Sequence, residues 1–126
     1  MLFRSRLRAG SVVVLDLSGL VVSGAGVLGN LTVVAPTGAG YLTAYPTPEG
    51  EPRTDGLDRP AASNLNFARG TGSLANFTVV ALGAGARLSI YTTTTAHVLL
   101  DLAAVSVSEP FSLTEPGVVT GALRRR

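Results

Sequence analysis

Cysteine and tryptophan are both absent from this chain of 126 residues, and the absence of cysteine excludes several kinds of chemistry. Without cysteine, no disulfide can stabilise the fold and no thiol can act as a nucleophile or a metal ligand. The only histidine, His97, has no partner at a ligand-like spacing, so we expect no metal site. No nucleophile motif accompanies His97 and Asp101, so we expect no catalytic residue and no bound cofactor.

Charged side chains and helical patterns are also scarce. Charged residues make up 14% of the sequence and apolar residues 46%, so threonine, serine, asparagine and glycine must build much of the surface. Such a surface suits close packing against neighbouring proteins. No apolar stripe has the period of a helix, and no uninterrupted apolar run is long enough to cross a bilayer, so we expect no membrane partner.

One stretch of the sequence is used twice, without a gap, at an offset of 46 residues. Residues 30–45 read NLTVVAPTGAGYLTAY, and residues 76–91 read NFTVVALGAGARLSIY. Each copy has a β-branched run, a Gly/Ala turn and a second run that ends in tyrosine, with the period-two alternation of strands. Because the turn glycines can adopt positive φ, we predict that each copy is a β-hairpin.

The remaining pattern completes an all-β prediction. Short β-type runs separated by 15 glycines and 7 prolines favour an antiparallel β-sandwich, or a jelly-roll-like barrel, built around the two hairpins. The last long strand is predicted over residues 97–107, with Val98, Leu100 and Leu102 inward. We predict a basic N-terminal arm over residues 1–11, a sandwich domain over 12–107, a C-terminal extension with a basic end over 108–126 and an exposed acidic loop over 47–60.

Positive charge is concentrated at the two ends. Six of the ten basic residues lie there, which leaves four arginines against eight acids in the rest of the chain, a balance of −4. Basic ends on an acidic body could bind a neighbouring subunit or simply be solvated. We do not expect a nucleic-acid partner. The predicted partner contacts are Arg4, Arg6, Arg8, Phe111, Arg124, Arg125 and Arg126.

Three segments carry a resemblance to a known family: NLTVVAPTGAGYLTAYP, RPAASNLNFARG and NFTVVALGAGARLSIYTTTTAHVLLDLAAV. Over about residues 8–105, the chain resembles a β-rich module of actinobacterial secreted proteins, which often lies beside peptidoglycan-active or protease domains. The resemblance implies a surface or adhesion-like module without a defined catalytic activity. It also implies a disulfide pair at two positions that are Thr47 and Ser89 here.

The departures from that family lead to the functional expectation. The missing cysteine pair, and Asp16 with several glycines in the only stretch that could be a secretory signal, fit assembly in a reducing cytoplasm. The first expectation is therefore a non-enzymatic virion component, such as a phage capsid decoration protein, that forms homo-oligomers and is assembled in the host cytoplasm.

Two alternatives stay open at this point. One is an extracellular actinobacterial module that binds cell-wall glycan or another surface polymer, because amides and aromatic rings can line sugar sites. The other is a self-assembling filament or surface-layer subunit. The candidate exposed binding surface consists of Tyr45, Asn64, Asn66 and Tyr91.

Overall fold

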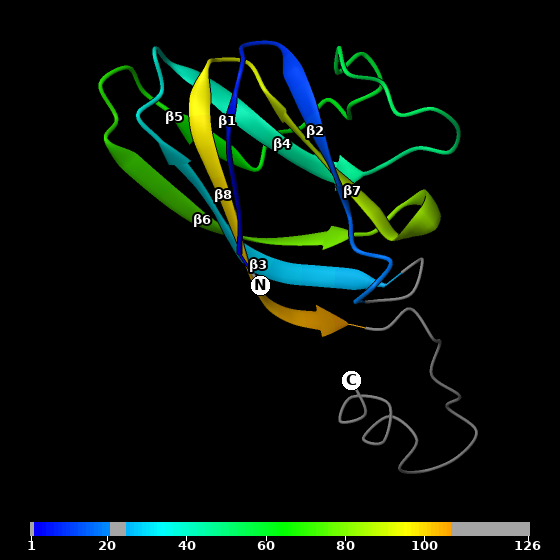
Figure 1. Ribbon diagram of the computed structural model, residues 1–126. Helices are drawn as coiled ribbons and strands as arrows, with labels where there is room; N and C mark the ends of the chain where they lie inside the picture. Colours follow the sequence, from blue (N-terminus) through cyan, green and yellow to red (C-terminus); the bar gives the residue numbers. More distant parts are fainter. Residues whose placement is uncertain (1, 21–24, 107–126) are drawn as a thin grey trace, which may run out of the picture.

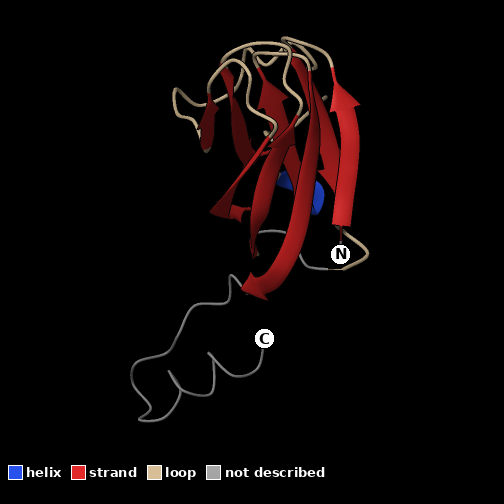
Figure 2. Ribbon diagram, turned by 90° about the vertical axis from the view of Figure 1, so that its left-hand side faces the viewer, coloured by secondary structure: helices blue, strands red, loops and turns tan. Residues whose placement is uncertain are grey.

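The structure is a computed structural model that describes residues 2–20 and 25–106. Two four-stranded sheets, antiparallel throughout, pack face to face, which confirms the predicted β-sandwich (Figures 1 and 2). Sheet A has the strand order β1-β8-β3-β6, and sheet B has the order β2-β7-β4-β5. The elements are β1 (Leu2–Leu7), β2 (Ser11–Asp16), β3 (Gly26–Val34), β4 (Gly40–Pro46), β5 (Leu65–Phe67), β6 (Ser73–Ala81), the short 3₁₀ helix η1 (Ala84–Ala86), β7 (Arg87–Thr92) and β8 (Ala96–Ser106).

Alternate residues of these strands fill the space between the sheets. Val98 and Leu100 are buried as predicted, and Leu102 is partly buried against the same core. Leu65 and Phe67 also point inward from β5. Burial of these apolar side chains provides the main driving force for the fold. The apolar side chains with no exposed surface at all are Leu31, Val33, Leu42, Leu88, Ile90 and Val98.

The predicted hairpins are wrong, because the two strands of each copy lie in different sheets. In the first copy β3 belongs to sheet A and β4 to sheet B, and in the second copy β6 and β7 are divided in the same way. Each copy is therefore a β-arch. Its connection passes from one sheet to the other at the ends of the strands, and the two strands face each other across the core. Alternating patterns and turn glycines are common to hairpins and arches, so they could not distinguish the two.

Two of the three residues with positive φ in the two connections are alanines rather than the predicted glycines. Gly85 has φ +67, but the other left-handed residues of the two connections are Ala35, with φ +50, and Ala86, with φ +58. These residues lie at the start of the first connection and at the end of the second. A left-handed residue reverses the chain locally, so it directs each connection away from its own sheet.

Corresponding strands of the two copies pair with each other. β3 pairs with β6, where Asn30 lies opposite Phe77 and Leu31 opposite Asn76. β4 pairs with β7, where Ala44 lies opposite Ile90. In β4 and β7 the paired residues Ala44 and Ile90 occupy the same position of the repeat. In β3 and β6 the pairing is shifted by one residue, so Leu31 faces the core and its counterpart Phe77 faces outward. The duplicated sequence thus forms three of the four central strands of the sandwich, β3, β4 and β7, and the edge strand β6.

Residues 2–7 are not an arm but an edge strand of sheet A. β1 pairs with β8 from Leu2 opposite Asp101 to Leu7 opposite Ala96. Leu7 is buried and Phe3 packs against the core, while Arg4 and Arg6 point outward, so the alternation that strands require was present in the basic segment. The predicted extension over 108–126, with Phe111, Arg124, Arg125 and Arg126, lies outside the described residues.

Candidate functional site

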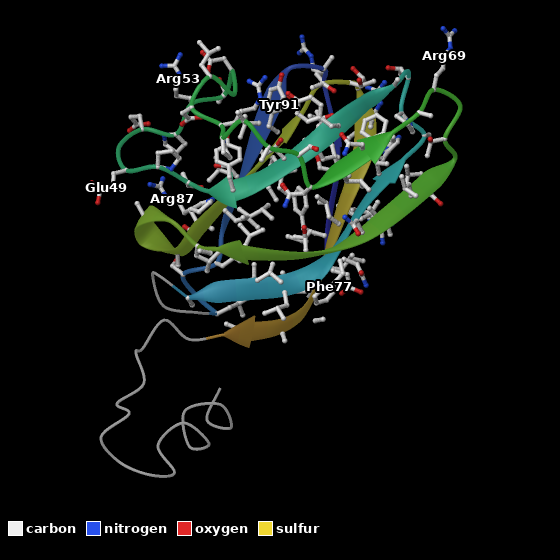
Figure 3. All side chains as sticks on the ribbon, turned by 180° about the vertical axis from the view of Figure 1, so that it is seen from behind. Glu49, Arg53, Arg69, Phe77, Arg87 and Tyr91 are labelled. Atoms are coloured by element: carbon white, nitrogen blue, oxygen red, sulfur yellow. The ribbon has the colours of Figure 1, made fainter. Side chains whose placement is uncertain are left out.

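The outer face of sheet B carries the three tyrosines of the chain, and the loop over residues 47–64 covers it (Figure 3). Only 3% of Tyr45 and 8% of Tyr91 are exposed. The prediction that these two side chains belong to an exposed binding surface is therefore wrong. The physical reason is that the polar loop packs on the sheet instead of extending into solvent.

Arg59 fixes the loop on the tyrosines. Its guanidinium carbon lies 4.1 Å from the ring centroid of Tyr91, and its Nη2 donates a hydrogen bond of 3.2 Å to the hydroxyl of Tyr41. Gly56, in a left-handed conformation with φ +74, contacts the Tyr91 ring so closely that a Cβ at residue 56 would collide with it. No signal in the sequence indicated this cation–π contact, because loop residues lack a period that would place them.

Tyr45 is held in the same cluster by Asp58. Its hydroxyl donates a hydrogen bond of 3.3 Å to Oδ1 of Asp58. Burial, together with the negative charge of Asp58, raises the pKa of Tyr45 to about 12 from the usual 10. The neutral phenol is thus favoured in the folded protein.

This pKa predicts a loss of stability in strong alkali. The folded pKa of Tyr45 is higher than the unfolded one, so its contribution is complete below pH 10 and is lost as the pH rises towards 12. We expect the free energy of unfolding to fall by about 2 kcal/mol over this range on account of Tyr45. Urea unfolding of the native protein and of Tyr45→Phe at several pH values measures the effect. Equal pH dependence in the two proteins would contradict it.

Thr47 and Ser89 form a buried hydroxyl pair beneath the loop. Their Oγ atoms lie 2.9 Å apart, and the residues are 1% and 2% exposed. These are the two positions at which the family resemblance implies a disulfide. The fold brings the two side chains together and satisfies them with a hydrogen bond instead.

Asn64 and Asn66 have different environments. Asn64 is half-buried, where its Oδ1 accepts a hydrogen bond of 2.8 Å from the amide of Ala44 and its Nδ2 donates one of 3.2 Å to Thr78 on β6. Asn64 therefore joins the two sheets rather than offering its amide to a ligand. Asn66 is exposed and, with Tyr41 and Arg59, lines an open hollow of about 620 Å³.

No segment among the described residues covers the outer face of sheet A, and one half of this face is apolar. Phe77 and Val79 on the edge strand β6 are 54% and 64% exposed. Leu28 lies opposite Val79 on β3, and Ala104 lies opposite Leu28 on β8, so these side chains form a continuous band across three strands. Figure 3 shows Phe77 on the side of the molecule away from Arg53 and the loop. We call Leu28, Phe77, Val79 and Ala104 the apolar band.

The other half of this face is basic. Arg4 and Arg6 on β1 and His97 on β8 surround Leu99, and together with Val34 they line a hollow of about 530 Å³. Arg4 and Arg6 are exposed, as is Arg8 after β1, so all three remain available for the predicted partner contacts. Among the described residues the only ion pair joins Arg53 and Asp55, on the opposite side of the sandwich.

Sequence reasoning missed the apolar band, although one signal was present. From residue 76 to 81 both alternating sets contain large apolar residues, Phe77 and Val79 in one set and Val80 in the other. Only one set can face the core of a two-layer sandwich. The hairpin prediction did not specify which face of each strand was covered, so the exposed apolar set was not identified.

The described ranges contain no cluster of three or more side chains suited to a metal ion. Nor does any helix in this part of the chain have the length and apolar character needed to span a membrane. No protein-family model, curated protein or solved structure matches the chain.

Proposed function

We propose that the protein is a non-enzymatic structural protein that packs against other protein subunits through the outer face of sheet A. The apolar band is the observation that supports this proposal. Phe77 and Val79 are more than half exposed and are continuous with Leu28. Contiguous exposed apolar side chains, bordered here by the exposed polar residues Asn30 and Asp101, are typical of surfaces that bind other proteins.

Within this class, we assign the chain to virion components such as phage capsid decoration proteins, assembled in the host cytoplasm. The buried pair of Thr47 and Ser89 supports the assignment. Their hydrogen bond links the end of β4 to β7 at the two positions where the family resemblance implies a disulfide. This link therefore forms without an oxidising compartment. The self-assembling filament or surface-layer subunit uses the same packing and differs in forming open contacts.

The second candidate function is binding of a surface glycan by an extracellular module. The hollow beside Tyr41 favours it, because the hollow combines an aromatic ring with the polar side chains of Arg59, Ser63 and Asn66. Retention of the protein on isolated cell walls would support this function over subunit packing.

Substitution in the apolar band tests the proposal. We expect the full chain to form a defined oligomer in light scattering, and Val79→Asp to weaken this assembly at least tenfold, because a carboxylate would be desolvated in the contact. Leu57→Asp is the matched control, since Leu57 is 71% exposed on the loop that covers sheet B. The virion assignment further predicts a fixed copy number in purified particles. A chain that neither assembles nor accompanies particles would contradict the proposal.

A further inference from the structure

The two edges of sheet A differ in how they are protected from pairing with another strand. Natural edge strands commonly carry charges, proline or bulges that prevent such pairing. β1 has Arg4 and Arg6. β6, with the sequence SLANFTVVA, has no charge and no proline and keeps one unbroken register with β3 over nine residues. In the described part of the chain, β6 pairs with β3 alone.

The duplicated sequence shows what kind of strand β6 is. β6 is the second copy of β3, and β3 has β8 paired along its other edge over its whole length, from Gly26 to Val34. The equivalent edge of β6 has no strand among the described residues. β6 is thus the copy of a central strand, with a central strand's uncharged sequence, placed at the edge of its sheet.

We propose that two copies of this chain pair through β6, antiparallel about a two-fold axis at Phe77, to form a continuous eight-stranded sheet. The proposal rests on the proposed function and specifies its first contact. Phe77 is the central residue of the nine in β6, so this register pairs the strand over its full length. It places Phe77 opposite Phe77 of the second copy, Ala75 opposite Val79, and Ser73 opposite Ala81.

The sequence of β6 is compatible with pairing to itself, which favours a second copy of this chain as the partner at this edge. A two-fold axis brings each strand against itself, so a charged strand would repel its own copy, whereas the uncharged β6 would not. Pairing through β1 would instead gather four arginine side chains along one seam. The register also allows an aromatic cross-strand pair between the two copies of Phe77, which removes exposed ring surface from water.

The C-terminal segment is the competing occupant, and its sequence fits the edge less well. Its longest stretch without proline, residues 117–126, contains two glycines and ends in three arginines. Both features disfavour a strand paired with β6, because glycine weakens strands and clustered arginines repel one another. We therefore assign the edge to a second copy and treat the segment as an outcome of the test.

Charge exchange across the axis tests the pairing and its register in the full chain. Ala75→Lys and Val79→Glu are each expected to raise the dimer dissociation constant about tenfold, because each substitution occurs twice at the seam. The double variant places the introduced lysine of each copy opposite the introduced glutamate of the other, so we expect its dissociation constant to return to within about threefold of the native value. Ala75→Lys with Val79→Lys should be monomeric. Sedimentation over a range of concentrations measures all four.

Several results would overturn the pairing. A double variant no better than its single variants would exclude this register, and an assembly unaffected by all the substitutions would place the contact elsewhere while leaving the proposed function intact. A monomeric protein whose β6 amides are nevertheless protected from hydrogen exchange would show that another segment of the chain covers the edge. Thermal unfolding of each variant serves as the folding control, since residues 75 and 79 are both exposed.

Discussion

Replacing Thr47 and Ser89 together by cysteine is expected to yield a disulfide that raises the free energy of unfolding by about 4 kcal/mol. The two Oγ atoms are 2.9 Å apart, so the side chains already point at each other, and a disulfide requires about 2 Å between the sulfurs. The residues are 42 positions apart in sequence. Closing a loop of this length removes conformational entropy from the unfolded chain, which is the main source of the gain.

Urea unfolding of the double variant, with and without reductant, measures this gain. Reduction should return the stability to about that of the native protein, because two buried thiols then replace two buried hydroxyls of similar size. Thr47→Cys alone is the control, since it has no partner and should not respond to reductant. Failure of the pair to oxidise in the purified protein, or an oxidised form less stable than the reduced one, would refute the expectation.

The fold class could be predicted from the sequence because alternation of side chains specifies strands locally. Val98 and Leu100 were placed correctly in the core, since a strand with period two has only one inward set. The pairing of strands was not predictable in the same way. Whether the chain after Val34 returns to its own sheet or crosses to the other depends on contacts between residues far apart in sequence, such as β3 with β8.

The interaction surfaces were predicted least well, and for a related reason. Tyr45 and Tyr91 resemble exposed aromatic residues in the sequence, but Arg59 and Gly56 bring a loop onto them. Phe77 resembles a core residue, since it occupies the position of buried Leu31 in the first copy, yet it points outward from the edge strand. Exposure depends on what covers a side chain, and local patterns do not contain that information.

Gly83→Ala is expected to lower the free energy of unfolding by about 3 kcal/mol. Gly83 lies where the second arch meets the end of β4, and a Cβ there would collide with the backbone of Thr47. The backbone on both sides is fixed: Thr47 donates a hydrogen bond of 3.2 Å to the carbonyl of Arg87 and accepts one of 3.1 Å from the amide of Ala84. Neither segment can move away without breaking these bonds, so the cost is that of overpacking a rigid site.

Gly72→Ala provides the matched comparison, because nothing lies within 4 Å of a Cβ built at that glycine. Its stability should change little, or increase slightly as the unfolded chain loses freedom. Chemical denaturation of both variants separates the collision from the general effect of removing a glycine. Equal stability of the two would mean that the arch connections can shift relative to β4. The buried pair of Thr47 and Ser89 beneath the same junction could then not be held in place, so the disulfide expected there would form poorly as well.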